Sequence, residues 1–253
     1  MYLPALPALE RDLDTSVAGT QATLSVYFLA FGVAQMLYGP LSDRHGRKVP
    51  LYAGLSLFTF ASIGCATAPT IGWLTLMRFL QGCRGAAVMV LPRALVRDLH
   101  TGPAATRLMA TIMLVVSVSP MLAPLAGSAL IALGDWRTIF AVLAGTALLA
   151  LDLTRLALPE TLPPDRRRAM DPVSLRRGVT TLLRDREFVG LTFVGGFGFA
   201  SFAVFPASAS SAYTGQFGLS PTGFSLAFAI NAFGFFGASQ LAAPAPSTST
   251  CSG

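Results

Sequence analysis

The sequence predicts an all-α integral membrane protein, a bundle of about seven transmembrane helices, and three observations support this fold class. Charged residues make up 12% of the 253 residues, whereas soluble domains carry roughly 25%. Long uncharged stretches cover residues 15–42, 49–77, 108–134 and 188–253. Basic residues gather between these stretches. Because backbone polar groups in lipid must be bonded within the chain, the uncharged stretches are expected to be helices.

Seven membrane crossings are expected in chain order, since each is long enough for a helix of about 20 residues that crosses the hydrocarbon layer. The last uncharged stretch is long enough for two of them. The crossings are about 20–42, 50–68, 72–93, 107–133, 138–157, 188–212 and 222–243.

Alternate connectors and the helix ends beside them hold 14 of the 18 basic residues, and this bias sets the orientation. Positively charged loops stay in the cytoplasm, so the segments 43–48, 94–106 and 158–187 are predicted to be cytoplasmic. The 14 residues are Arg44, Arg47, Lys48, Arg93, Arg97, Arg107, Arg155, Arg166, Arg167, Arg168, Arg176, Arg177, Arg184 and Arg186.

The net charge of +6 is explained by these loops, which argues against nucleic-acid binding. Cys65, Cys83 and Cys251 lack the spacing of metal or redox pairs. His45 and His100 fall in connectors without nearby ligands. No metal, cofactor or nucleic acid is therefore expected, and an enzyme is disfavoured because the spans hold no cluster of catalytic side chains.

The first cytoplasmic turn, residues 39–48, reads Gly-Pro-Leu-Ser-Asp-Arg-His-Gly-Arg-Lys. It resembles the loop signature of the major facilitator superfamily between helices two and three. A glycine there permits a tight turn with positive φ, an aspartate can face the positive end of a neighbouring helix, and the arginines are expected at the wet face. The alternative is a generic basic turn. The positions singled out are Gly39, Asp43, Arg44, Gly46 and Arg47, with Asp98 as the expected gate partner of Arg47.

Span 72–93 contains Arg78 and Gln81 in an Arg-Phe-Leu-Gln-Gly run, which is similar to the superfamily's helix-four element. An arginine within hydrocarbon usually faces a cavity or a partner, and the resemblance implies a part in proton coupling. The alternative is that Arg78 snorkels to the outer interface. Arg84 lies deeper in the same span, where it either lines the cavity or disturbs packing.

Span 107–133 carries Pro120, Pro124 and Gly127 in a stretch that resembles the antiporter motif of helix five. Prolines four residues apart remove two backbone hydrogen bonds on one face and are expected to bend the helix. Small residues between them permit close helix approach. An ordinary kinked membrane helix is the alternative.

Three further stretches, 1–7, 93–99 and 136–140, resemble the Bcr/CflA drug-resistance group. By this resemblance the spans are helices two to eight of twelve, in a major facilitator type bundle that is truncated at both ends. It implies a half bundle lacking its first helix at 1–157, a cytoplasmic central linker at 158–187, two helices of the second half at 188–243 and an irregular tail at 244–253. Part 172–186 of the linker is either an amphipathic helix on the inner membrane surface or a solvated segment.

No carboxylate lies deep inside a predicted span, because Asp152 sits near the predicted cytoplasmic end of its span, so cavity candidates are neutral or aromatic. Tyr27, Gln35, Gln81 and Asn231 are intramembrane polar residues that need partners. A phenylalanine surface for amphipathic drugs is a second possibility, with packing or lipid contact as its alternative. Its members are Phe28, Phe31, Phe197, Phe199, Phe202 and Phe205.

The resemblance implies a secondary active transporter that couples inward protons to the efflux of small amphipathic drugs or metabolites across the inner membrane. The expected partners are the small-molecule substrate, protons and the bilayer, and the chain is expected to be monomeric. The alternative is a truncated fragment that does not transport.

Overall fold

The computed structural model describes residues 1–163, 165, 167, 172–213, 217–220, 222–227 and 229–230, without the side chains of 117, 120, 121, 172–175, 199 and 201–211. The regular structure of these residues is helical. The elements are η1 (Leu3–Ala5), α1 (Leu6–Asp12), α2 (Val17–His45), α3 (Lys48–Ala66), α4 (Ile71–Leu99), α5 (Gly102–Leu133), α6 (Trp136–Ala157), α7 (Pro172–Arg184) and α8 (Arg186–Ser211). Residues 222–227 and 229–230 are also helical.

The all-α membrane bundle predicted from the sequence is confirmed. Within the described residues, α2, α3, α4 and α6 are long and apolar enough to cross a membrane, and α5 contains two shorter apolar stretches. Several helices outlast their predicted spans; α4, for example, continues to Leu99. The extra turns carry basic residues that remain in water, so the helix is longer than its apolar part.

Several helix starts are fixed by short polar side chains. Ser16 accepts the N–H of Gly19 at the start of α2, and Thr70 accepts the N–H of Trp73 at the start of α4. Asp135 begins α6 with a capping box. These groups satisfy N–H donors that have no partner within the helix. The start of α3 has no such side chain of its own, and its cap comes from a distant segment.

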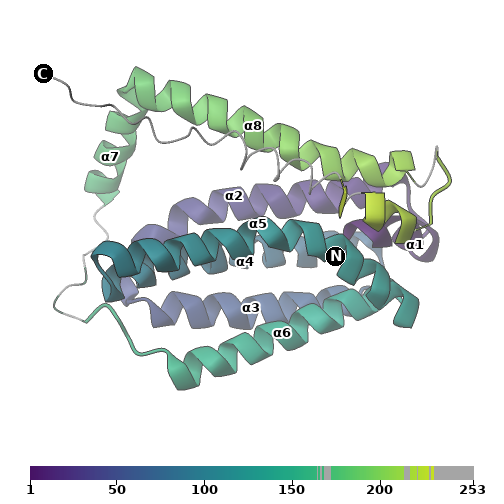
Figure 1. Ribbon diagram of the computed structural model, residues 1–253, viewed down its shortest axis with the longest axis horizontal. Helices are drawn as coiled ribbons and strands as arrows, with labels where there is room; N and C mark the ends of the chain where they lie inside the picture. The colour runs from purple at the N-terminus through teal and green to yellow at the C-terminus, as the bar shows by residue number, and fades with distance from the viewer. Residues whose placement is uncertain are drawn as a thin grey trace, which may run out of the picture.

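The bundle is built by packing α2 on α4, α4 on α3 and α3 on α6. These helices lie lengthwise and side by side, and α8 follows the far side of α2 (Figure 1). One apolar core surrounds Trp136 and Phe140 near the predicted outer ends, and a second surrounds Tyr38 and Leu91 near the inner ends. Both cores position polar side chains that lie between α2, α3 and α4.

Candidate functional site

The turn between α2 and α3 buries one arginine. Gly46 adopts φ +86°, so the predicted tight turn with positive φ is confirmed. Arg44 is exposed as expected, but Arg47 is only 8% exposed, so its expected place at the wet face was wrong. The side chain of Arg47 points inward, where its guanidinium donates to three acceptors.

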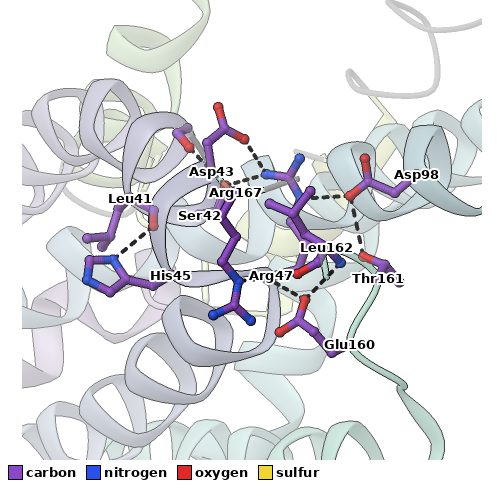
Figure 2. Close-up of polar contacts among 11 residues, drawn as sticks. Leu41, Ser42, Asp43, His45, Arg47, Asp98, Glu160, Thr161, Leu162 and Arg167 are labelled. Carbon is purple, nitrogen blue, oxygen red and sulfur yellow. Dashed lines mark hydrogen bonds and ion pairs between the residues drawn. The ribbon is translucent and has the colours of Figure 1, made fainter. Parts of the chain in front are cut away.

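Three side chains hold the guanidinium of Arg47 (Figure 2). Its Nε lies 2.7 Å from an Asp98 carboxylate oxygen, and its Nη1 lies 2.8 Å from Asp43 and 2.6 Å from Ser42. Burial alone would lower the pKa of Arg47, but the hydrogen bonds to Asp98 and Asp43 raise it above its ordinary value. Arg47 therefore stays charged and ties the end of α2 to the end of α4.

The expected contact between Arg47 and Asp98 is thus present. Asp43 pairs with Arg47 four residues later, and its expected place facing the positive end of a neighbouring helix stays a prediction. Its side chain is 49% exposed. Gly39 lies one turn earlier in α2, where its carbonyl accepts the hydroxyl of Ser42.

Glu160, which sequence reasoning did not single out, supplies the missing cap of α3. Its carboxylate accepts the backbone N–H groups of Arg47 at 2.9 Å, Lys48 at 3.2 Å and Leu162 at 3.0 Å. A side chain at Gly46 would meet Glu160, since a Cβ built there lies 2.6 Å from its Oε2. The glycine therefore provides both the turn and the space for this carboxylate.

The electrostatics at Glu160 follow from this position. Partial burial would raise the pKa of Glu160, but the backbone hydrogen bonds from Arg47, Leu162 and Lys48 and the nearby Arg167 lower it overall. The positive end of the α3 dipole favours the charged form in the same way. Thr161 adds a hydrogen bond to Asp98 at 3.3 Å, so the start of the linker is bound to both sides of the turn (Figure 2).

A second polar group lies among the membrane helices at Arg78 of α4. Arg78 is 6% exposed, so it is packed among the helices and does not snorkel. Its Nη1 donates to Gln81 at 2.6 Å, and Gln81 donates to Ser62 of α3 at 2.7 Å. Gln81 therefore bridges Arg78 and Ser62 of α3.

Two aromatic rings enclose the Arg78 guanidinium. Its central carbon lies 4.2 Å from the ring centre of Tyr27 and 4.6 Å from that of Tyr2. The Tyr2 hydroxyl is held by Thr23 at 2.7 Å. Nε of Arg78 is buried without a hydrogen-bond partner, and no ion pair to Arg78 occurs within the described residues. The site is thus a buried cation whose Nε has no hydrogen-bond partner.

The remaining polar candidates divide. Arg84 donates to the hydroxyl of Tyr38 at 3.1 Å and so joins α4 to α2. Gln35 is exposed and makes no side-chain hydrogen bond within the described part, contrary to the expectation that it finds a partner. Asn231 lies outside the described residues. Of the phenylalanines, Phe28 and Phe197 are exposed and Phe31 stacks on Tyr27, whereas the side chains of Phe199, Phe202 and Phe205 are not described.

α5 is one continuous helix through Pro120 and Pro124. Gly127 is buried, and the backbone of Met1 fills the space where its Cβ would be. The hydroxyl of Ser225 donates to the carbonyl of Pro124 at 3.0 Å and pairs with Ser128 at 2.5 Å. This face of α5 thus contacts both the start of the chain and the helix at 222–227, and the bend expected at the prolines stays a prediction.

A cluster at the predicted outer ends was also missed by the sequence reasoning. Arg137 at the start of α6 donates to Asp12 at 2.6 Å and to the carbonyl of Ala68 at 3.3 Å. Trp136 donates to the same Asp12 oxygen at 3.0 Å. The hydrogen bonds from Arg137 and Trp136 lower the pKa of Asp12. The cluster joins α1, α6 and the loop before α4.

Comparison with known proteins places these features in a family. The Major Facilitator Superfamily model matches residues 1–247. The chain belongs to the major facilitator superfamily. It is therefore a multi-pass membrane protein of a transporter family and not an enzyme.

Relatives include drug-resistance proteins of this superfamily. The chain is 37% identical over 236 residues to the uncharacterized MFS-type transporter YdgK of Bacillus subtilis, covering 91% of this chain and 58% of that protein. It is 31% identical over 231 residues to a bicyclomycin resistance protein homolog of Haemophilus influenzae, with the same coverage of 91% and 58%. A chloramphenicol resistance protein of Pseudomonas aeruginosa is 33% identical over 232 residues, which cover 90% of this chain and 54% of that protein.

A solved structure supports the fold alone. The human organic anion transporter TETRAN superposes with a TM-score of 0.59 at 19% sequence identity, covering 92% of this chain and 60% of that one. The chain thus spans a little over half of the length of the first relatives and of this structure.

Proposed function

We propose that the chain takes part in secondary active transport, in which protons moving inward drive the efflux of small amphipathic compounds across the inner membrane. The drug-resistance relatives support the substrate class. The observation that carries the proposal is Arg78, a buried permanent cation within membrane-crossing helices. Such a charge is costly in hydrocarbon and is usually kept for function.

The geometry supports a role for Arg78 in proton coupling. An arginine does not release its proton at physiological pH, so it acts as a fixed charge that shifts the pKa of a nearby carboxylate. Tyr2 packs against Arg78 at 4.6 Å, so a carboxylate that comes close to this ring would respond to the same charge.

The cluster around Arg47 and Asp98 would act as the inner gate of the alternating-access cycle. Its charges join helix ends on the side that is predicted to be cytoplasmic, and transporters of this kind rock one half against the other. Gly39, Arg44 and the α5 region at Pro120, Pro124 and Gly127 are proposed to shape the hinges of that movement. Gln81 and Tyr27 hold Arg78, whereas Gln35 and Asn231 remain candidates for the substrate path.

The test is accumulation of ethidium by cells that express the chain, with its membrane level measured by immunoblot. The proposal expects lower accumulation that returns to the control level when a protonophore removes the proton gradient. Arg78→Ala should abolish the effect, whereas Arg155→Gln, which changes an exposed arginine on α6, should not. Normal membrane levels without any effect on accumulation would contradict the proposal and favour a chain that packs in the membrane without transporting.

A further inference from the structure

α7 carries apolar residues on one side and basic residues on the other. Val179, Leu182 and Leu183 have the spacing that places side chains in one stripe of a helix. Arg176 flanks this stripe, and Arg177 and Arg184 lie farther round the helix at 100° per residue. From Pro172 to Arg184 there is no acidic residue, so the helix is a uniformly basic amphipathic element.

The protein leaves this helix uncovered in the structure. Residues 176–184 are all exposed, including Val179 at 40%, Leu182 at 46% and Leu183 at 68%. A helix of this kind gains little from standing free in water, because its stability normally comes from covering its apolar face. A surface that would cover this helix must offer apolar groups to its apolar stripe and negative charges to its arginines.

The place of α7 in the fold identifies that surface. α8 begins at Arg186, two residues after α7 ends, and the sequence from Phe188 onward is uncharged. α7 therefore stands where the chain enters the membrane on the cytoplasmic side. In Figure 1 it runs steeply across the direction of α8 and of the bundle helices. A helix that crosses the direction of the membrane-spanning helices at their cytoplasmic end lies along the membrane plane.

We propose that α7 lies in the cytoplasmic leaflet surface and binds anionic phospholipids. Val179, Leu182 and Leu183 enter the boundary of the acyl chains, and the arginines bind lipid phosphate groups. Amphipathic helices with basic polar faces bind membranes in this manner, and anionic headgroups attract basic residues next to a membrane span. This inference does not depend on transport activity, since it concerns the anchoring of the linker.

The test uses the full chain in nanodiscs, with the photo-crosslinker p-benzoylphenylalanine at Val179 or, as the opposite-side comparison, at Thr181. The discs contain either phosphatidylcholine alone or an equimolar mixture with phosphatidylglycerol. Mass spectrometry then identifies what each position captures. We expect phospholipid capture at Val179 and little at Thr181, and more capture at Val179 in the anionic discs. The probe at Leu183 repeats the apolar-side measurement if the Val179 variant does not fold.

The charge requirement is tested by R176Q/R177Q/R184Q in the Val179 probe variant. Capture should fall several-fold, since each arginine near an anionic surface changes partitioning by about fivefold. The matched control is R97Q/R107Q/R155Q, which removes three exposed cytoplasmic arginines outside α7 and should leave capture unchanged. Capture of protein at Val179, equal lipid capture at Val179 and Thr181, or capture that is insensitive to both phosphatidylglycerol and the three arginines would each overturn the proposal.

Discussion

Glu160, in the segment after α6, accepts the backbone N–H of Arg47 at 2.9 Å across 113 residues of sequence. The same carboxylate accepts Lys48 and Leu162. The start of α3 is therefore capped by the segment that was predicted to be the cytoplasmic central linker. A movement of the linker relative to the first half would expose these N–H groups, which links the position of the linker to the stability of the inner turn.

Removing the Glu160 carboxylate should release this turn. Glu160→Ala is expected to cost about 1 kcal/mol, the usual contribution of a helix cap, and Glu160→Gln less because its amide oxygen still accepts hydrogen bonds. Hydrogen exchange by mass spectrometry should show faster exchange of the peptide that contains Arg47 and Lys48 in Glu160→Ala. Glu187→Gln, an exposed acidic residue at the start of α8, is the control. Unchanged exchange in Glu160→Ala would show that the cap does not hold the turn.

Acid should remove the charge-dependent part of the same contact. The pKa of Glu160 is lower in the folded chain than its ordinary value of about 4.3. The stabilisation by the charged carboxylate is therefore complete above the ordinary pKa and is lost as the pH falls through the pKa of the folded chain. The difference in unfolding temperature between the wild type and Glu160→Gln should therefore be constant near neutral pH and shrink as the pH falls below the ordinary value of about 4.3. A difference that persists in acid would mean that the Glu160 charge is not its cause.

Exchanging the charges of Arg47 and Asp98 tests their coupling. Arg47→Asp and Asp98→Arg are each expected to cost about 1.5–3 kcal/mol, the range for hydrogen bonds to charged groups. The double variant should recover part of this loss. Recovery will be incomplete, because Asp43 also binds Arg47 at 2.8 Å and would face a new carboxylate. Thermal unfolding of the four proteins in detergent gives the coupling energy, and purely additive losses would count against an inner gate built on this pair.

Much of the bundle was predictable from the sequence, because uncharged stretches and basic connectors report lipid contact and orientation directly. The turn at Gly46 and the pair of Arg47 with Asp98 were also predictable, since they lie in short motifs at helix ends. Glu160 was not, because its role depends on a linker that folds back on a turn far away in sequence. Contacts between distant segments leave no periodic signal.

The environment of Arg78 was likewise not predictable, because it depends on a contact between distant segments. The residue was singled out as an intramembrane charge, but its enclosure by Tyr2 was not foreseen, because the first expected crossing begins at about residue 20. The inward turn of Arg47 was missed for a related reason. A basic residue in a loop is normally solvated, and only the three-dimensional positions of Asp98 and Ser42 explain its burial.

The two tyrosine rings predict a contrast between substitutions at Tyr27. The Arg78 guanidinium lies 4.2 Å from the Tyr27 ring centre, and a cation over an aromatic face contributes about 0.5–2 kcal/mol. Tyr27→Leu removes the face and should lower stability by about this amount, whereas Tyr27→Phe keeps it and should be nearly neutral. Thermal unfolding in detergent distinguishes them. Equal losses in both variants would show that the hydroxyl, and not the ring, is what the site uses.

A close approach of α2 and α4 predicts the last contrast, between two glycines. A Cβ built at Gly82 of α4 would meet the backbone carbonyl oxygen of Tyr27 and would lie 3.1 Å from the Cβ of Ala30. Gly82→Ala must therefore push the helices apart, at a cost of about 1–3 kcal/mol for an overpacked core. The separation would also loosen the rings around Arg78.

Gly32 of α2 is the matched control, because nothing lies within 4 Å of a Cβ built there. Gly32→Ala adds the same methyl group to a membrane helix and should leave stability unchanged or raise it by up to about 1 kcal/mol, since glycine weakens a helix relative to alanine. Unfolding temperatures of the two variants, measured in the same detergent, decide the matter. If Gly82→Ala proves as stable as Gly32→Ala, the helices have room that the structure does not show, and Arg78 is not held by close packing of α2 on α4.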